Sequence, residues 1–398
     1  MTAEAKKHAP VLVFLLCFLA GLCEGYDMLV AGITAPRFAP VFRLDAQQLG
    51  LVFSASTFGL FLGAIIGGRM ADHVGRRRVV IVSLALLGVF SIGSALAGDA
   101  NALLLMRLLA GLGLGGVLPN ILALTNESSR PGNAAMRVTM LGSAMPFGGG
   151  LVAGLTAARP DLDWQTVFWI GGIAPLGVAG LMSLALPESP AFRSRGPDTP
   201  RAGIATALGG DRRLIASLLL WTGSFFTALA LYMMINWLPL LLTAKGFVKA
   251  DVGKVVMLLT LGGAASGFVF GALSRVPMRG LLYVLTWAGM AVSAVAMAKS
   301  GHDLRIAALA GFGIGFFISG GQFLLYALST ELYPAYVRGT GTGFAVGIGR
   351  LGAVAGPLLA RALLMDNHDA GTVMLAMVPL IFASLAASLP LLRKKEVA

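Results

Sequence analysis

The feature that most constrains this sequence is its division into twelve long apolar runs, separated by short breaks with charged residues, Pro or Gly. A helix needs about 20 apolar residues to cross the hydrocarbon core of a bilayer, and each run is of this order. The runs start near Val11, Leu49, Val79, Ala102, Met136, Gln165, Leu214, Val252, Leu281, Leu304, Gly339 and Val373. Only 12% of the residues are charged, whereas soluble domains contain about 25%. We therefore predict an all-α membrane protein with twelve transmembrane helices.

The distribution of charge argues against a nucleic-acid partner, although the net charge is +12. Most of the 30 Lys and Arg residues fall in alternate breaks and in the two terminal segments. Under the positive-inside rule, this pattern puts both termini in the cytoplasm. The first run contains two acids and lacks a cleavage site of small residues, so we expect it to be retained as a transmembrane helix. We predict no cofactor, no bound metal and no nucleic acid.

Two carboxylates, Glu24 and Asp27, lie well inside the first run. A charge at bilayer depth is costly unless it is paired, protonated or in contact with water, so this pair indicates a functional site. Three residues apart, the two acids share one face of a helix. Asp27 lies about 14 Å below the outer end of its helix, and Arg107 in the fourth run about 9 Å below its own. An arginine side chain spans the difference, so we expect Asp27 and Arg107 to approach each other.

This pairing leaves two interpretations open. The ion pair is static, or Asp27 takes part in proton coupling. If Arg107 keeps Asp27 ionised, Glu24 is the alternative titrating group. Asp27 and Glu24 are therefore the candidate proton-coupling residues.

Arg350 lies inside the eleventh run, about 18 Å along the helix from Arg338. A guanidinium at this depth needs an anion, and its planar fork suits a carboxylate. We expect a substrate carboxylate there, with Glu24 as the alternative partner. The other candidate substrate-binding residues are polar or aromatic, and each could serve helix packing instead. They are Arg107, Tyr26, Asn120, Tyr232, Asn236, Gln322 and Tyr326.

The break after the second run, Gly68 to Arg78, combines glycines with one acid and four arginines. Its glycines permit close helix approach, and its charges can lock neighbouring helix ends. A related segment, Gly271 to Arg279, recurs about 200 residues later, as expected for a duplicated chain. We predict two pseudo-symmetric six-helix bundles, at 1–186 and 212–398, joined by a cytoplasmic linker at 187–211. Candidate gating residues are Gly68, Asp72, Gly75, Arg76, Glu127, Glu331 and Arg338.

Rows of glycine in the second, fourth and eleventh runs indicate helix faces that pack closely. They comprise Gly59, Gly63 and Gly67, then Gly111, Gly113 and Gly115, and finally Gly343, Gly347, Gly352 and Gly356. The two cysteines, Cys17 and Cys23, lie in the first run and are expected to serve as small packing residues.

Several of these motifs resemble those of known transporters. Gly68 to Arg78 resembles the signature loop G-x-x-x-D-x-x-G-R-[RK]-[RK] of the major facilitator superfamily. Glu24-Gly25-Tyr26-Asp27 resembles the D-G-x-D signature of the aromatic acid:proton symporter family, with Glu in place of the first Asp. Arg107–Glu127 and Arg338–Pro357 look like helices 4 and 11 of that family. Through WQTVFWIGG, YMMINWLPLLL and GGQFLLYAL, the chain is most similar to the 3-(3-hydroxyphenyl)propionate transporters.

The resemblance implies proton-driven uptake of a small aromatic carboxylate across a bacterial inner membrane, in aromatic hydrocarbon catabolism. It also implies that the acid at Asp27 is essential and that the loop after the second helix forms a charge network in the outward-open state. The substrate would be 3-(3-hydroxyphenyl)propionate or a hydroxybenzoate, carried by alternating access. We expect a monomer.

Two other functions are less well supported by the sequence. A drug:proton antiporter of the same fold carries G-P-x-x-G-G in its fifth helix, and here Met145 stands in place of the first glycine. A membrane enzyme or receptor would need a metal cluster or a soluble domain. The four histidines, His8, His73, His302 and His368, fall in breaks or at helix ends, and the linker is too short for a domain. We therefore predict a transporter and not an enzyme.

Overall fold

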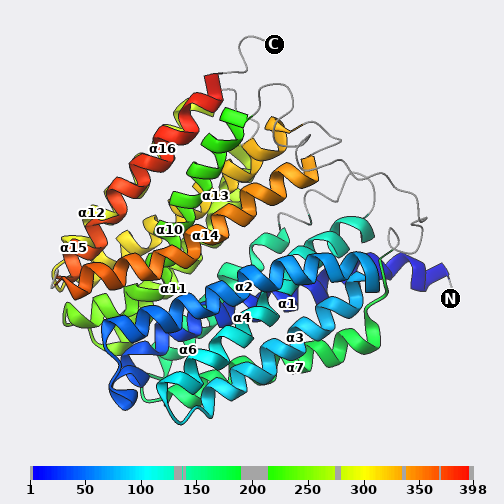
Figure 1. The fold of residues 1–398 in the computed structure, drawn as a ribbon, viewed down its shortest axis with the longest axis horizontal. Helices are drawn as coiled ribbons and strands as arrows, with labels where there is room; N and C mark the ends of the chain where they lie inside the picture. The colour runs from blue at the N-terminus through cyan, green and yellow to red at the C-terminus, as the bar shows by residue number, and fades with distance from the viewer. Residues whose placement is uncertain are drawn as a thin grey trace. The chain divides into compact units, whose positions relative to one another are not determined.

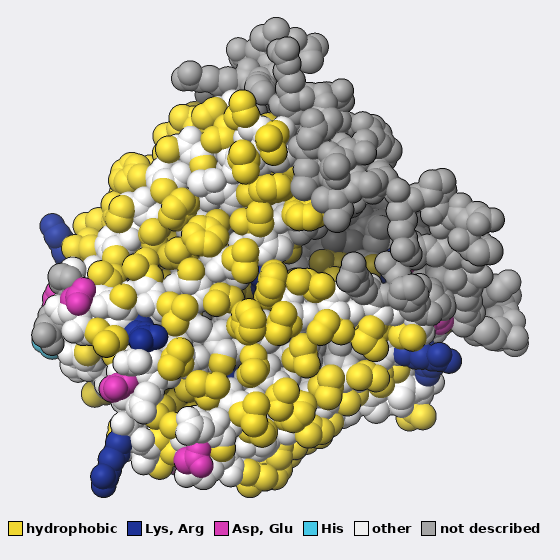
Figure 2. Space-filling view, in the orientation of Figure 1, with side chains coloured by type: hydrophobic (Ala, Val, Ile, Leu, Met, Phe, Trp, Pro, Cys, Tyr) yellow, Lys and Arg dark blue, Asp and Glu magenta, His cyan; other side chains and the backbone are white. Residues whose placement is uncertain are grey.

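The computed structural model describes residues 3–129, 137, 140–189, 214–273, 279–333, 338–366 and 369–393. Every regular element in these ranges is a helix, and twelve segments are long and apolar enough to cross a membrane. The spans start at or close to the predicted positions, for example at Val11, Leu214 and Leu304, which confirms the predicted all-α membrane fold. Hydrophobic side chains cover most of the described surface in Figure 2, as expected for helices that face lipid.

The helices form two compact units, and the boundary between them in the sequence lies between Pro197 and Asp198 (Figure 1). The first unit contains α1 (Ala3–Phe42), α2 (Ala46–Val74), α3 (Arg76–Ala95), α4 (Ala100–Ser128), α6 (Ala144–Ala158) and α7 (Trp164–Ala185). The second contains α10 (Leu214–Ala244), α11 (Lys249–Leu273), α12 (Arg279–Ala298), α13 (Leu304–Leu332), α14 (Arg338–Met365), α15 (Ala370–Leu375) and α16 (Met377–Arg393). Most of the predicted linker lies outside the described residues, so its bounds stay a prediction.

Acidic residues cap the starts of several helices. The first N–H groups of a helix have no partner within it, and a preceding carboxylate can accept from them. Asp45 forms a capping box with Gln48 at the start of α2, and Asp99 accepts from the Ala102 N–H at the start of α4. Asp303 and Asp369 cap α13 and α15 in the same way. These charged caps keep the ends of the apolar helices well defined.

Glycines bring the helices of the first unit into backbone contact. Between α2 and α4, a Cβ at any of four glycines would lie under 3.0 Å from backbone atoms of the facing helix. These are Gly59, Gly63, Gly111 and Gly115. Gly25 of α1 and Gly148 of α6 make an equally close crossing. The predicted close packing of the second and fourth helices is therefore confirmed.

The second unit repeats this scheme of helix pairs. Helices α11 and α13 cross through Gly262 and Gly315, as α2 and α4 do in the first unit. Helices α10 and α14 cross through Gly352 and Gly356, as α1 and α6 do. This correspondence supports the predicted duplication. One part of the prediction is wrong: no described atom lies within 4 Å of a Cβ placed at Gly347, so the closely packed row in α14 is shorter than expected.

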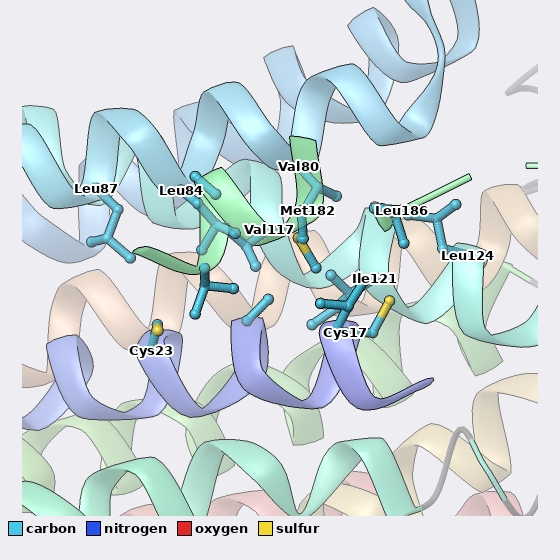
Figure 3. Close-up of a cluster of buried hydrophobic side chains, with 14 of the residues drawn as sticks. Cys17, Cys23, Val80, Leu84, Leu87, Val117, Ile121, Leu124, Met182 and Leu186 are labelled. Atoms are coloured by element: carbon cyan, nitrogen blue, oxygen red, sulfur yellow. The ribbon is translucent and has the colours of Figure 1, made fainter. Parts of the chain in front are cut away.

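The core of the first unit is a continuous apolar cluster, drawn in part in Figure 3. It combines side chains of α1, α3, α4 and α7 around Val117 and Ile121, which are fully buried. Cys17 and Cys23 are buried in this cluster, and neither forms a disulfide. Their predicted role as packing residues is confirmed. The cluster holds α1 and α4 at fixed positions relative to each other. The buried charged residues of these two helices lie within a few residues of cluster members, namely Cys23 on α1 and Ala110 on α4.

Candidate functional site

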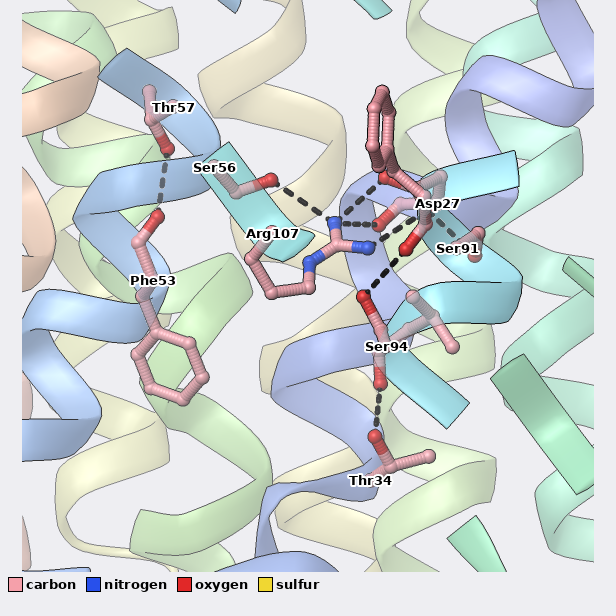
Figure 4. Close-up of polar contacts among 10 residues, drawn as sticks. Asp27, Thr34, Phe53, Ser56, Thr57, Ser91, Ser94 and Arg107 are labelled. Atoms are coloured by element: carbon pink, nitrogen blue, oxygen red, sulfur yellow. Dashed lines mark hydrogen bonds and ion pairs between the residues drawn. The ribbon is translucent and has the colours of Figure 1, made fainter. Parts of the chain in front are cut away.

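The centre of the first unit contains a buried ion pair between Asp27 of α1 and Arg107 of α4 (Figure 4). Nη1 of Arg107 donates to Oδ1 of Asp27 at 2.9 Å, and Nη2 donates to Oδ2 at 2.7 Å. Asp27 is 0% exposed and Arg107 is 1% exposed. The predicted approach of these two residues is confirmed. Two parallel charge-assisted bonds of this kind fix both side chains relative to each other.

Three further side chains surround the pair. Ser91 of α3 donates to Oδ1 of Asp27 at 3.3 Å, and Nη2 of Arg107 donates to Oγ of Ser56 on α2 at 2.9 Å. The guanidinium also lies over the ring of Phe168 on α7, 5.5 Å from its centroid. Three further helices, α2, α3 and α7, therefore contact the ion pair that joins α1 and α4. The sequence did not single out Ser56, Ser91 or Phe168, because single serines and phenylalanines in apolar helices are common.

Glu24 and Tyr26 lie on the same helix as Asp27 but have different surroundings. Glu24 is one turn away from Asp27 and is 1% exposed. Tyr26 donates its hydroxyl to the backbone oxygen of Val167 at 2.9 Å, and its ring lies against Gly171. In this arrangement, Tyr26 joins α1 to α7. A substrate contact for Tyr26 stays a prediction.

The second unit holds the other charged candidate, Arg350 of α14. Its Nη1 donates to the hydroxyl oxygen of Tyr232 on α10 at 2.7 Å. Both side chains are only partly buried. The structure thus brings together two of the predicted substrate-binding residues. Tyr232 limits the rotation of the guanidinium and orients its donor edge.

Two asparagines among the predicted ligands have the same local geometry. Nδ2 of Asn120 donates to the Gly116 oxygen one turn earlier on α4, at 2.8 Å. Nδ2 of Asn236 donates to the Tyr232 oxygen one turn earlier on α10, also at 2.8 Å. Both residues are buried. Gln322 and Tyr326 are partly buried on α13, one turn apart.

A second polar cluster joins α3, α4 and the segment after α7. Arg76 at the start of α3 forms an ion pair with Glu127 near the end of α4. Ser189 donates its hydroxyl to the same Glu127 carboxylate. Glu188 accepts from the backbone N–H groups of Arg76 and Arg77, at 3.0 Å and 3.1 Å. The carboxylate of Glu188 therefore occupies the positive end of the α3 dipole.

Gly75 is required at this cluster for a conformational reason. Its φ is +96°, a backbone conformation that residues other than glycine rarely adopt. A Cβ at this position would also collide with the Glu188 carboxylate. Sequence reasoning identified Gly75, Arg76 and Glu127 but missed Glu188 and Ser189. The signal available was a carboxylate directly after a predicted helix, close to the boundary of the linker.

The remaining gating candidates have a less defined environment. No described atom lies within 4 Å of a Cβ placed at Gly68, so the close helix approach expected there is not seen. The side chains of Asp72, Glu331 and Arg338 lie outside the described part of the chain. A gating role for these four residues stays a prediction.

These features define the class of the molecule. The described residues contain twelve helices that can span a membrane, in two units with matching helix pairs, and a buried ion pair lies inside the helices of the first unit. These features describe a multi-pass membrane protein of the transporter type. The family model described as Major Facilitator Superfamily matches residues 17–357 of this chain. The chain therefore belongs to this superfamily. It is a transporter and not an enzyme.

Relatives and solved structures agree with this assignment. The chain is 40% identical to the 3-(3-hydroxy-phenyl)propionate transporter of Escherichia coli strain K12, over 100% of this chain and 98% of that protein. It is 31% identical to the gentisate transporter of Corynebacterium glutamicum, over 86% and 79% of the two chains. Its fold is similar to the D-xylose-proton symporter, with a TM-score of 0.76, 17% identity and coverage of 95% and 97%.

Proposed function

We propose that this protein is a proton-coupled symporter that imports a small aromatic carboxylate by alternating access. The observation that carries the proposal is the Arg350–Tyr232 pair inside the second unit, in a chain that is 40% identical over its full length to a 3-(3-hydroxy-phenyl)propionate transporter. The gentisate transporter and the gallate transporter of Pseudomonas putida are further relatives named for aromatic acids. The substrate class is therefore a hydroxylated aromatic acid, such as 3-(3-hydroxyphenyl)propionate or a hydroxybenzoate.

Arg350 binds the substrate carboxylate in this proposal. A guanidinium presents five N–H donors in a planar fork, so it can donate to the Tyr232 hydroxyl and to a carboxylate at the same time. Tyr232 keeps the fork in one orientation, which reduces the entropy lost when a substrate binds. A lysine at this position would lack the second parallel donor.

The proton is carried by Glu24 in this proposal. Both carboxylate oxygens of Asp27 accept from Arg107, so a proton on either oxygen would compete with a charge-assisted bond that joins α1 to α4. Glu24 is a second buried carboxylate on the same face of α1, one turn from Asp27. The Asp27–Arg107 pair then holds α1 against α4 while Glu24 gains and loses the transported proton.

The orientation and the gate follow from the same proposal. The protein lies in the bacterial inner membrane as a monomer, with both termini in the cytoplasm. The Arg76–Glu127 ion pair, together with Glu188 and Ser189, stabilises the cytoplasmic end of the first unit. The outward-open protein takes up a proton and a carboxylate, and both leave on the cytoplasmic side after the units rearrange.

The experiment that tests this function is uptake of labelled 3-(3-hydroxyphenyl)propionate into proteoliposomes, with and without an acid-outside pH gradient. We expect wild type to accumulate substrate only with the gradient. Glu24→Gln should lose accumulation but retain exchange of external for internal substrate, because exchange needs no net proton movement. Arg350→Lys should weaken both reactions through a higher KM, and Asp161→Asn, at an exposed loop, is the matched control.

Two results would contradict the proposal. Accumulation by wild type that does not depend on the gradient would argue against proton coupling. A wild-type protein that transports no aromatic acid would make the substrate class wrong, and export of cationic drugs would then be measured.

A further inference from the structure

The side-chain amide of Asn236 has a fixed orientation. One of its terminal atoms lies 2.8 Å from the backbone oxygen of Tyr232, in the preceding turn of α10. A backbone oxygen can only accept a hydrogen bond, so the atom next to it must be the NH2 group. The other terminal atom is therefore Oδ1, an acceptor that this bond does not use. A flip of the amide would put Oδ1 beside the Tyr232 oxygen and lose the bond.

The position of Asn236 places this acceptor close to the proposed carboxylate site. Tyr232 and Asn236 are four residues apart on α10 and share one face, with about 6 Å between them along the axis. Tyr232 itself is hydrogen-bonded to Arg350. Asn236 is only 5% exposed, and among the described residues no group donates a hydrogen bond to its Oδ1. An acceptor without a donor in the protein favours a ligand that brings its own donor.

We propose that Oδ1 of Asn236 accepts the hydrogen bond of the ring hydroxyl of the substrate, so that Asn236 selects hydroxylated over unhydroxylated aromatic acids. The inference rests on the proposed function, because it takes Arg350 as the carboxylate site. In 3-(3-hydroxyphenyl)propionate the carboxylate chain and the hydroxyl are attached at ring positions 1 and 3, so they point in different directions. One end then meets Arg350 and the other meets the next turn of α10, with the ring between them.

In this proposal the substrate hydroxyl donates the hydrogen bond and Asn236 accepts it. A site built to bind a hydroxyl discriminates against an analogue that lacks it, because the acceptor loses its partner. An ether oxygen in place of the hydroxyl can accept but cannot donate. A methoxy analogue should therefore be as poor a substrate as the unsubstituted acid. A site that donated to the substrate would instead retain the methoxy compound.

The test compares three acids as substrates of the full-length protein in proteoliposomes under an acid-outside gradient. They are 3-(3-hydroxyphenyl)propionate, 3-(3-methoxyphenyl)propionate and 3-phenylpropionate. For wild type we expect kcat/KM for the hydroxylated acid to exceed that for the other two by about 10-fold or more. In Asn236→Leu, which has a similar volume but no acceptor, the three values should fall within about 3-fold of one another.

Two control variants accompany this comparison. Thr222→Val removes an exposed hydroxyl of α10 that bonds its own helix, at the Leu218 oxygen, and should keep the wild-type ratio. Asn120→Leu removes the asparagine of the first unit with the matching geometry. Loss of selectivity in Asn120→Leu, with wild-type selectivity in Asn236→Leu, would overturn the assignment to Asn236.

The wild-type measurements alone also decide the matter if Asn236→Leu does not fold. Equal transport of the hydroxylated and unsubstituted acids, or good transport of the methoxy acid, would overturn the inference and leave the proposed function standing. Failure of wild type to transport any of the three acids would overturn the proposed function together with the inference.

Discussion

At the scale of single residues, the ion pair of Asp27 and Arg107 makes the clearest prediction about stability. Removing one partner of a buried ion pair leaves an uncompensated charge and costs about 3–5 kcal/mol, whereas replacing both with apolar groups is often close to neutral. We expect Asp27→Asn and Arg107→Gln each to lower the thermal unfolding temperature in detergent by several degrees. The double variant Asp27→Leu/Arg107→Met should regain most of the loss in stability.

The control for this experiment is the exposed pair of Arg159 and Asp161, whose side chains are 62% and 67% exposed. Exposed ion pairs contribute little because solvent screens them. Asp161→Asn should leave the unfolding temperature unchanged. Single variants at Asp27 and Arg107 that are as stable as wild type would show that the pair is not held as tightly as its geometry indicates.

The approach of Asp27 and Arg107 could be predicted from the sequence, whereas their serine neighbours could not. Charges inside apolar helices are rare, and their depth follows from counting residues, so Asp27 and Arg107 could be matched. Ser91 and Ser56 complete the network, but a serine in a transmembrane helix is compatible with many environments. The orientation of the Asn236 side-chain amide could not be predicted from the sequence either, because it depends on which backbone oxygen lies beside the amide.

At the scale of helices, the crossing of α2 and α4 depends on glycine. A Cβ at Gly115 would meet the backbone of Leu60 and Ala64, which cannot move aside as a flexible side chain can. We expect Gly115→Ala to force the two helices apart and to destabilise the first unit by about 1–3 kcal/mol, measured by thermal unfolding. Gly177→Ala on α7, where no described atom lies within 4 Å of the new Cβ, is the matched control. Equal stability of both variants would contradict this account of the crossing.

The cap of α15 predicts a dependence on pH. The pKa of Asp369 is held below its ordinary value, chiefly by the hydrogen bond from the Thr372 hydroxyl and also by backbone N–H groups. Because the folded pKa is lower than the unfolded one, the stabilisation is complete above about pH 4 and is lost as the pH falls through the folded value. Amide exchange of α15, corrected for intrinsic rates, should therefore rise at low pH in wild type.

A neutral side chain at this cap separates the charge from the capping bond. Asn is also a good helix cap, so Asp369→Asn should show amide exchange in α15 that changes little over the same pH range. Asp369→Ala should exchange faster at every pH. If wild type and Asp369→Asn respond to acid in the same way, the titration of Asp369 does not control this helix start.

At the scale of the whole molecule, the fold was the part that the sequence predicted best. In a bilayer every backbone polar group must be satisfied within the helix, so apolar length and charged breaks alone define the spans. The structure divides the last span into α15 and α16 around Ala376, a break that the sequence analysis did not predict. Pro379 marks it, because proline has no N–H to donate to the Leu375 oxygen and its ring clashes with that carbonyl. Duplication was indicated by Gly271–Arg279, which keeps the first Gly and the last Arg of Gly68–Arg76 at the same spacing.

Function was predictable only to the level of the charged residues and the resemblance. Arg350 indicates an anionic substrate, and the relatives indicate which kind. The sequence did not distinguish the roles of Glu24 and Asp27. The proposal that Glu24 carries the proton and Asp27 joins α1 to α4 depends on the structure, in which both oxygens of Asp27 are bonded to Arg107. Proton coupling is thus the central claim that a direct measurement should test.

That measurement is the movement of protons driven by the substrate itself. Proteoliposomes with a pH-sensitive dye in the lumen and no initial pH gradient would receive an inward gradient of 3-(3-hydroxyphenyl)propionate, with the membrane potential clamped. We predict that the lumen acidifies with wild type and not with Glu24→Gln, because substrate enters together with a proton. Uptake of the labelled acid by wild type without any acidification would contradict the account.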